Sequence, residues 1–392
     1  FATITRALQS ALSGDTIIIY NGVYAETVTI DTNNISLIGS DSVLTVINPA
    51  GDSSVSMLYG IQANNVSGLL IKNLYVFDCY TGVYLNNVNN SVIEDVSVGY
   101  CGQNISPYTA AGISLSNNSS NDIVINCKIE NSFVGIVVDS AYLNTVQSNL
   151  VLSTISQGIS LRTYSDSNIV ENNVCQFNGN GIDLSGASAN RIIHNSILNS
   201  ASHGFNIANN SNYNYFAHNH IFGSTQNGIY ISNSIGLKFI QNECDSNAKY
   251  AVNIIGALSQ LNVFAKNNFI TGSTNPDSGV SNDTSAILDF INNYWGTTDS
   301  VQIANKMRGA YSSAINWSPF LLSAVDTSIG GDSIAPRSPD TVAVSVNGTT
   351  ATISWSEVIY NEDGSLYSAD KGGYKIYRSQ TPNPSNWGAD IA

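Results

Sequence analysis

The chain has 392 residues, only 11% of which are charged, and 14 Lys+Arg against 28 Asp+Glu give a net charge of −14. Typical soluble domains contain about 25% charged residues, and this negative balance argues against nucleic acid and anionic membrane surfaces as partners. No apolar stretch reaches the roughly 18 residues that a transmembrane helix needs, so we expect no membrane span. The chain begins with Phe1, and we expect a mature or truncated product.

Between residues 82 and 254 the sequence repeats itself about every 23 residues. A Gly-apolar-x-apolar unit begins each copy, and a second apolar segment that contains Asn lies between copies. Both segments alternate with a period of two, which is typical of short strands with one face inward. Two or three strands per coil, without helical periodicity, predict a β-solenoid whose coils stack about 4.8 Å apart. The units are Gly82-Val-Tyr-Leu85, Gly112-Ile-Ser-Leu115, Gly135-Ile-Val-Val138, Gly158-Ile-Ser-Leu161, Gly181-Ile-Asp-Leu184, Gly204-Phe-Asn-Ile207, Gly228-Ile-Tyr-Ile231 and the degenerate Ala251-Val-Asn-Ile254.

An asparagine recurs once per period in the second segment. Residues one period apart form columns in a solenoid, and an inward Asn at a turn can bond to its copies in the coils above and below. Such bonds satisfy polar groups that are costly to bury. The sequence therefore predicts a structural ladder of Asn172, Asn195, Asn219, Asn242, Asn267 and Asn292.

The chain resembles the secreted right-handed parallel β-helix proteins, which include pectate-lyase-like and NosD-like members. The similarity runs from Thr3 to about Leu322 and begins with Ile4–Tyr24, which is similar to the family's short capping helix and first strand. It ends with Asn292–Gly296 and Asn316–Phe320, which resemble the family's closing segment. The resemblance implies an all-β, right-handed, single-stranded parallel β-helix over residues 1–324, a scaffold that carries many different functions.

The end of the solenoid is expected to be closed by a helix and by aromatic side chains. Asp299 or Ser300 can cap a short helix that reaches about Met307, and we expect Trp295 and Trp317 to cover the last coil. Covering matters because an open solenoid end exposes strand edges and an apolar cross-section.

After the solenoid, residues 325–339 are rich in Ser, Gly, Asp and Pro and are interpreted as a linker. Residues 340–392 resemble the first half of a fibronectin type III domain, with Trp355 and Tyr374 at positions typical of core aromatics. Half a β-sandwich cannot bury its own core, so we expect the natural chain to continue past Ala392. The strands predicted in this incomplete β-sandwich module are Thr341–Val346, Thr350–Trp355 and Gly373–Arg378.

One outward face of the solenoid combines acids, amides and an arginine. A polysaccharide lyase or glycoside hydrolase needs carboxylates that shuttle protons and a cation that neutralises charge. The candidate catalytic residues are Asp139, Arg162, Asp183 and His203. The alternative is that Asp139 and Arg162 form a solvated cross-strand pair worth under about 1 kcal/mol.

A second outward column contains two histidines one coil apart, His194 and His218. Two imidazoles about 5 Å apart could hold a transition metal, with Glu171 as an oxygen ligand. The alternative is a solvated face, since no fourth ligand is evident. No cofactor is required, although calcium or a transition metal stays open. The predicted column is Lys72, Glu94, Gln147, Glu171, His194, His218, Gln241 and Lys266.

The coil between Gly82 and Gly112 is seven residues longer than its neighbours, 30 residues against 23. Its extra segment, around residues 103–110, should project as a loop, where binding residues commonly lie. Tyrosine rings can stack on sugars, but tyrosine is also favoured in strands, so a structural role is the alternative. The candidate binding residues are Tyr108, Ser160, Asn206 and Tyr230.

The chain has five cysteines and no CxxC pattern, which argues against a zinc site. Cys79 and Cys101 fall at equivalent positions of adjacent coils, within reach of disulfide geometry. The alternative for this pair is two stacked free thiols.

The known catalytic motifs of pectate-lyase-like relatives, among them the Asp-Pro-His-Asp signature of mannuronan epimerases, do not occur in this sequence. The sequence therefore favours a non-catalytic, secreted or cell-surface solenoid that acts as an extracellular scaffold or adhesion module. Its expected partners are an extracellular glycan or other copies of itself. The alternative is a polysaccharide lyase or glycoside hydrolase that acts on an extracellular polysaccharide.

Overall fold

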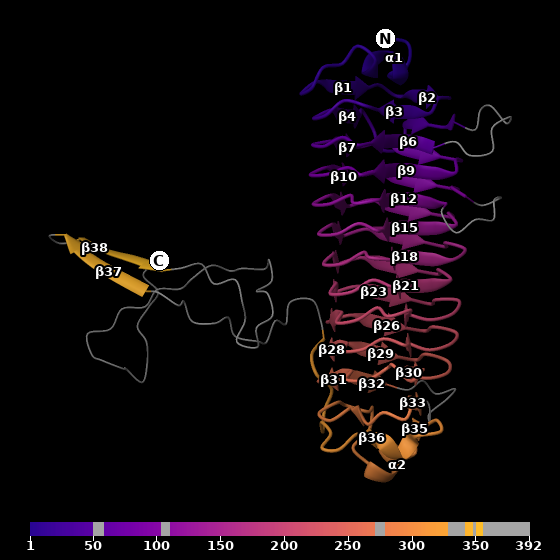
Figure 1. The fold of residues 1–392 in the computed structure, drawn as a ribbon, viewed down its shortest axis with the longest axis vertical. Coiled ribbons are helices and arrows are strands. Elements are labelled where there is room, and N and C mark those ends of the chain that lie inside the picture. The colour runs from indigo at the N-terminus through magenta and orange to yellow at the C-terminus, as the bar shows by residue number, and fades with distance from the viewer. Residues whose placement is uncertain (50–58, 103–109, 271–278, 328–341, 348–349, 356–392) are drawn as a thin grey trace. The chain divides into compact units, whose positions relative to one another are not determined.

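The computed structural model describes residues 1–49, 59–102, 110–270 and 279–327, together with the backbone of 342–347 and 350–355. Residues Phe1–Thr327 form one compact unit, and Ser328–Ala392 form a second. The first unit is a stack of about a dozen coils built from short parallel strands (Figure 1). The all-β parallel solenoid predicted from the repeat is therefore confirmed.

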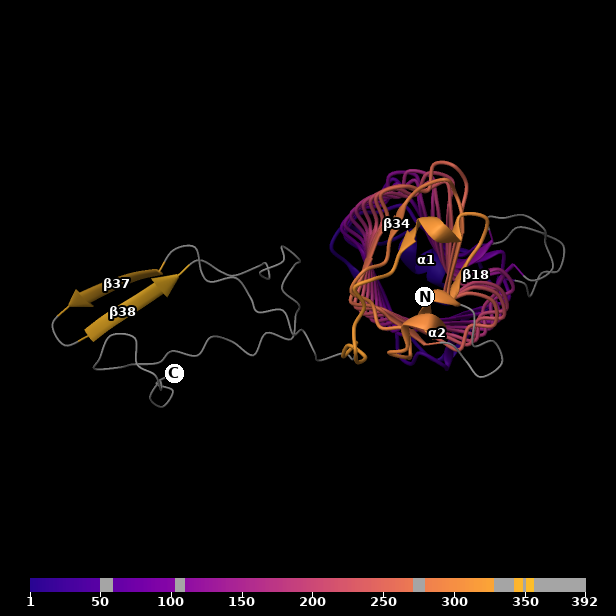
Figure 2. The same ribbon diagram turned by 90° about the horizontal axis from the view of Figure 1, so that it is seen from below.

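Each regular coil contributes one strand to each of three parallel sheets, as the view along the axis shows (Figure 2). The first sheet contains β1 (Thr16–Ile19), β4 (Ser36–Gly39), β7 (Leu70–Lys72), β10 (Val92–Glu94), β13 (Ile123–Ile125), β16 (Thr145–Gln147), β19 (Ile169–Glu171), β22 (Arg191–Ile193), β25 (Tyr215–Ala217), β28 (Lys238–Ile240), β31 (Val263–Ala265), β34 (Leu288–Asp289) and β36 (Ile315–Asn316). The second contains β2 (Gly22–Tyr24), β5 (Thr45–Ile47), β8 (Tyr75–Phe77), β11 (Ser97–Gly99), β14 (Lys128–Glu130), β17 (Leu150–Leu152), β20 (Val174–Gln176), β23 (Ser196–Leu198), β26 (His220–Phe222), β29 (Glu243–Asp245) and β32 (Asn268–Ile270). The third contains β3 (Val28–Ile30), β6 (Tyr59–Asn64), β9 (Thr81–Asn86), β12 (Ala111–Ser116), β15 (Val134–Asp139), β18 (Gln157–Arg162), β21 (Asn180–Ser185), β24 (Phe205–Ala208), β27 (Ile229–Ser232), β30 (Val252–Ile255), β33 (Val280–Asp283) and β35 (Met307–Arg308).

The repeated glycine is required by the close approach of successive coils at the start of the third-sheet strands. A Cβ atom on Gly82 would lie 2.5 Å from the carbonyl oxygen of Gly112, and one on Gly135 would lie 2.3 Å from that of Gly158. Such distances are far inside van der Waals contact, so only glycine fits. This explains why the repeat begins on Gly, and why the apolar residues that follow point into the core.

The asparagine ladder exists, but it contains Asn173 and Asn293 where we predicted Asn172 and Asn292. Asn195 accepts the backbone N–H of Asn173 at 3.0 Å, and its Nδ2 donates to Oδ1 of Asn219 at 3.0 Å. Asn172 and Asn292 have φ of 56° and 58°. They therefore turn the chain just before Asn173 and Asn293, whose side chains point inward. The buried ladder is Asn149, Asn173, Asn195, Asn219, Asn242, Asn267 and Asn293.

A second ladder, of Asn144, Asn168, Asn190 and Asn214, begins with an aspartate. Asp122 accepts the N–H of Ser91 at 2.8 Å through Oδ1, while its buried Oδ2 has no hydrogen-bond partner among the described residues. In the next coil the equivalent atom, Nδ2 of Asn144, donates to the carbonyl oxygen of Ser119 at 3.0 Å. A carboxylate cannot donate in this way, and burial raises the pKa of Asp122 to about 7.

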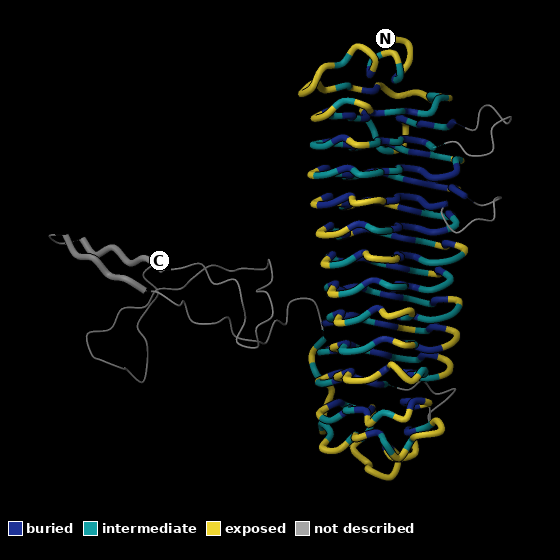
Figure 3. Tube along the Cα trace, in the orientation of Figure 1, coloured by how far each residue is buried: buried dark blue, intermediate teal, exposed yellow. Residues whose placement is uncertain are grey.

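The core is aliphatic in the early coils and aromatic in the late ones. Phe216, Phe239, Phe264 and Phe290 stack in succession, with ring centroids 4.4, 4.6 and 4.2 Å apart. Exposed residues gather at the two ends of the solenoid and along its turns (Figure 3). The late coils are thus held by ring stacking as well as by strand pairing.

Both ends carry closures at the predicted places, but the second helix ends at Ala304 and not near Met307, which lies in β35. Helix α1 (Ile4–Leu8) is capped by Thr3, and the carboxylate of Glu26 accepts the N–H groups of Ile4 and Thr5 at 2.9 Å. At the other end, α2 (Ser300–Ala304) is capped by Asp299 and is followed by a 3₁₀ turn, η2 (Ser312–Ala314). Trp295 is fully buried there, and Trp317 packs half-buried against the core.

In the second unit, β37 (Val342–Asn347) and β38 (Thr350–Trp355) form an antiparallel pair. These match two of the three strands predicted there, and the third, with Tyr374, lies outside the described residues. Across the described part of the chain, no helix is long and apolar enough to cross a membrane.

Replacing the buried ladder residue should cost far more than replacing its neighbour. Asn173→Ala leaves the groups that bond to its amide unpaired, so we expect a loss of about 2–3 kcal/mol in unfolding free energy. Asn172→Gly keeps the positive φ without a side chain, and we expect a change within about 0.5 kcal/mol. Urea denaturation followed by circular dichroism measures both, and equal losses would contradict the assignment of the ladder to Asn173.

Asp122 should make stability depend on pH. Its folded pKa of about 7 lies above the usual carboxyl value, so the folded state binds more protons than the unfolded state, and stability falls as pH rises from about 4 to about 7. Asp122→Asn restores the ladder donor, and we expect it to stabilise the protein by on the order of 2 kcal/mol at pH 8 and much less at pH 4. A difference between variant and wild type that does not change with pH would contradict this account.

Candidate functional site on the third sheet

The parallel register of the third sheet brings the polar residues of its outward face into two columns. Ser160 lies beside Asp183, Asp183 beside Asn206, and Asn206 beside Tyr230. In the neighbouring column, Asp139 pairs with Arg162. We call these six residues, with His203, the third-sheet face.

Asp183 lies at the centre of this face and is almost fully buried. Its Oδ1 accepts the amide N–H groups of Asn206 and, at 3.5 Å, of Asn180. Burial raises the pKa of Asp183, and the bonds from Asn206 and the nearby Arg162 charge oppose that rise. The carboxyl group is thus held by its neighbours rather than presented to solvent.

Arg162 also bonds within the face. Its Nε donates to Oγ of Ser160 at 3.1 Å, a hydroxyl that is fully buried. Burial lowers the pKa of Arg162, and the charges of Asp139 and Asp183 act in the opposite direction. The guanidinium group remains charged at any physiological pH and balances part of the acidic charge around it.

His203 forms an aromatic pair with Tyr230 on the next coil. The two rings are stacked, with centroids 4.7 Å apart and planes 8° from parallel. Nδ1 of His203 faces the backbone N–H of Asn227 at 3.3 Å, which assigns the proton of the neutral ring to Nε2. Burial lowers the pKa of His203 to about 4, so the ring is neutral at neutral pH. Nε2–H is then a hydrogen-bond donor, and Nδ1 is already occupied by the N–H of Asn227.

Two amide oxygens on the adjoining coils lack donors. Oδ1 of Asn227, beside His203, and Oδ1 of Asn253, paired in register with Tyr230, are buried and have no hydrogen-bond partner in the part of the chain that the structure describes. A buried acceptor without a donor costs about 1–3 kcal/mol. These two oxygens are therefore unsatisfied acceptors beneath the surface of the face.

The predicted histidine column combines two different columns: Lys72, Glu94, Gln147 and Glu171 share one register position, and His194, His218, Gln241 and Lys266 lie one residue later in their coils. Glu171 pairs with Ile193, whereas His194 and His218 have φ of 55° and 54° and occupy the turns that follow. The two imidazoles do stack, with centroids 4.8 Å apart and planes 13° apart. Nearly parallel rings do not aim their nitrogens at one common point, and Glu171 lies outside their column.

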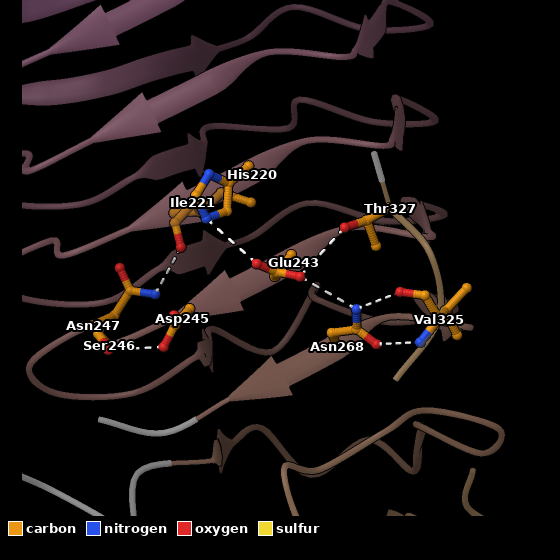
Figure 4. Close-up of polar contacts among 9 residues, drawn as sticks. All are labelled: His220, Ile221, Glu243, Asp245, Ser246, Asn247, Asn268, Val325 and Thr327. Atoms are coloured by element: carbon orange, nitrogen blue, oxygen red, sulfur yellow. Dashed lines mark hydrogen bonds and ion pairs between the residues drawn. The ribbon is translucent and has the colours of Figure 1, made fainter. Parts of the chain in front are cut away.

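A second polar cluster lies on the outward side of the second sheet, where the end of the solenoid unit passes over it (Figure 4). Asn268 holds residue Val325 by a pair of bonds, donating to its carbonyl oxygen at 2.7 Å and accepting its N–H at 2.8 Å. Thr327 donates to Glu243, which also lies 3.4 Å from Nε2 of His220. We call residues 325–327 the strap, and an amide side chain here serves in place of a strand partner.

The sequence matches the family described as periplasmic copper-binding protein (NosD) over residues 8–227, more than half of the chain. This chain belongs to the NosD family. No curated protein matches the sequence.

Solved structures share the solenoid fold of this NosD-family chain. The A-module of mannuronan C-5 epimerase AlgE6 from Azotobacter vinelandii superposes with a TM-score of 0.58 at 15% identity, covering 82% of this chain and 94% of that one. An alginate lyase from Paenibacillus sp. str. FPU-7 gives 0.50 at 18%, covering 69% and 95%. PfbA, a surface adhesin of Streptococcus pneumoniae, gives 0.49 at 12%, covering 74% and 85%. At such identities a likeness concerns the fold alone.

The family description names copper, but the residues described in this NosD-family chain do not fit such a site. Copper in proteins is held by converging imidazole, thiolate or thioether ligands. No group of three or more His, Cys, Asp or Glu side chains that could hold a metal occurs among the described residues. The stacked pair His194 and His218 supplies two rings without the predicted third ligand.

Sequence reasoning found the acids and the arginine of the face but missed what surrounds them. Asn180, Asn227 and Asn253 were not singled out, although each occupies the same outward column positions as His203 or Tyr230. Extending the columns by one coil in each direction would have found them. The strap carries no periodic signal, and Tyr108 lies outside the described residues.

Removing the amide that holds the strap should expose it to proteases. In Asn268→Ala, the bonds to Val325 are lost, and we expect elastase to cleave after Ala324 or Val325 roughly fivefold faster or more. Asn209→Ala, which removes an exposed amide in the turn after β24, is the matched control. Mass spectrometry of the products measures the rates, and unchanged cleavage would show that the strap is held by other contacts.

Proposed function

We propose that this NosD-family solenoid is a non-catalytic extracytoplasmic protein that binds a glycan on its third-sheet face and acts as a scaffold or adhesion module. The observation that carries the proposal is that ionisable groups of this face are already hydrogen-bonded to neutral neighbours within the protein. Asp183 is bonded to Asn206 and Asn180, Arg162 to Ser160, and His203 has Nδ1 directed at a backbone N–H. A proton-transfer catalyst needs such groups facing the substrate.

The chemistry of the face favours a neutral glycan over a polyuronate. The half-buried side chains of Asp139 and Asn206 offer acceptor oxygens at the surface of the face, and sugar hydroxyl groups are donors. A polyanion would instead meet Asp139, Asp183 and a chain whose net charge is −14. His203 and Tyr230 each cover one face of the other ring, so sugar C–H groups would pack against the ring faces that the stack leaves uncovered.

Localisation outside the cytoplasm, secreted or at the cell surface, is part of the proposal. Support comes from the family description, which names a periplasmic protein, and from a charged fraction of only 11%. Residues 340–392 would then belong to a fibronectin type III-like spacer, consistent with the antiparallel pair β37 and β38. Such spacers separate binding modules from the surface that carries them.

Side-by-side assembly of copies is the other way in which such a scaffold could act. The outward positions of the first sheet carry aliphatic side chains among charged ones such as Lys72, Glu171 and Lys238, and apolar sheet faces can pack about 10 Å apart. The residues concerned are Leu70, Val92, Ile123, Ile125, Ile169, Ile193, Ile240 and Val263.

The second candidate function is a polysaccharide lyase or glycoside hydrolase that uses the same face. One observation favours it: Arg162 lies between two acids while His203 and Tyr230 lie on the following coils. In this reading, Arg162 would neutralise a substrate carboxylate and the raised pKa of Asp183 would let it act as an acid. Its buried position must open before it can do so.

Binding and turnover on one glycan panel separate the two functions. We expect a neutral glycan to bind without new reducing or unsaturated ends, and Tyr230→Ala to weaken binding tenfold or more. Tyr142→Ala, an exposed ring on a turn, should leave binding unchanged. Products that disappear in Asp183→Asn would overturn the non-catalytic proposal. Sedimentation of the unliganded protein as a monomer would remove self-assembly from it.

A further inference from the structure

Two cysteines meet at the corner between the second and third sheets. Cys79 follows β8 and Cys101 follows β11, and these strands pair in register, with Phe77 beside Gly99. The cysteines are therefore equivalent residues of successive coils. Their Sγ atoms lie 2.8 Å apart, and the N–H of Gly102 donates to the carbonyl oxygen of Cys79 at 2.8 Å.

The later coils hold this corner together by side-chain hydrogen bonds. Cys101 N–H donates to Oγ of Ser132, and Thr154 donates to Oδ1 of Asn178 through both its N–H and its hydroxyl. Thiols are weak donors and weak acceptors. The side chains that accept these bonds are Ser132 and Asn178, whereas the two coils before Ser132 carry Cys79 and Cys101, whose thiols accept only weakly.

We propose that Cys79 and Cys101 form a disulfide that cross-links these two coils in the mature protein. Neighbouring strands lie about 4.8 Å apart, inside the Cα separation of roughly 4.4–6.8 Å that a disulfide spans. This disulfide does not depend on glycan binding. It is one of the two arrangements, a disulfide or two free thiols, that the sequence allows for this pair.

The other three cysteines have no cysteine beside them on the neighbouring coils. Cys127 donates its N–H to Asn149, Cys175 pairs with Val151 and Ile197, and Cys244 pairs with Ile221 and Phe269. All five cysteines of the chain lie among the described residues. The fold therefore allows one intramolecular pairing and leaves three thiols in the core.

The reaction is thiol–disulfide exchange with a small disulfide such as oxidised glutathione. One cysteine thiolate attacks a sulfur of the oxidant, forming a mixed disulfide and releasing one oxidant thiolate. The second cysteine thiolate then attacks the protein sulfur of the mixed disulfide and releases the other. The protein loses two protons and two electrons, and the oxidant disulfide is reduced to two thiols.

Burial governs when this exchange can occur. It raises the pKa of the Cys79 thiol well above its ordinary value, so little thiolate exists once the coils have closed. We therefore expect oxidation to accompany folding, and we expect a reductant to reach the finished disulfide slowly. The link closes a loop of 22 residues and so restricts the unfolded chain.

Alkylation under denaturing conditions tests the proposal. After refolding with oxidised glutathione, we expect three alkylated cysteines, five minus the linked two, and an intact mass lower by two hydrogen atoms. Peptide mapping should join Cys79 to Cys101, and Tm should be about 3–6 °C higher than after reduction. Reduction by dithiothreitol should be much faster in urea than in buffer.

Two variants make the result specific. Cys79→Ala/Cys101→Ala should abolish the dependence of Tm on reductant, and Cys127→Ala should keep it. The wild-type mapping needs no variant and stays decisive if either variant fails to fold. Five alkylated cysteines after oxidation, or a link that joins other cysteines or two chains, would overturn the proposal.

Discussion

The solenoid depends on how its corners satisfy backbone groups that no strand can pair. Where one strand ends and the chain turns toward the next sheet, inward side-chain amides accept N–H groups of the preceding coil and donate to its carbonyl groups. Asn195 does both, since it accepts from Asn173 and donates to Val170. Without these bonds, each coil would bury unpaired polar groups at its corners, and neither the three sheets nor the face built on them would stack in register.

The repeat predicts the fold well because its causes are local. Glycine recurs where carbonyl groups of adjacent coils approach within 3 Å of a would-be Cβ, and the period of two fixes which residues point inward. The same logic placed Asp139 beside Arg162, and Ser160, Asp183 and Asn206 in one column. Those residues lie within regular strands, where counting along the sequence and counting in space agree.

Prediction failed at the corners, where the two counts differ. Asn172 and Asn173 are both asparagines, and only the backbone shows that the first has a positive φ and the second enters the ladder. The same ambiguity moved Glu171 out of the column of His194 and His218. The His203–Tyr230 stack and the strap were missed for another reason, because they depend on side-chain conformation and on contacts between residues far apart in sequence.

The ladder also has a direction. Along the run from Asn173 to Asn267, each amide donates toward the C-terminal neighbour and accepts from the N-terminal one, so the small dipoles add instead of cancelling. A coil inserted in this run would find a donor on one side and an acceptor on the other, already matched to its own asparagine. Insertion or deletion of a whole coil therefore keeps the ladder continuous. An insertion or deletion of a few residues would interrupt it. The length of such a solenoid therefore changes in steps of one coil.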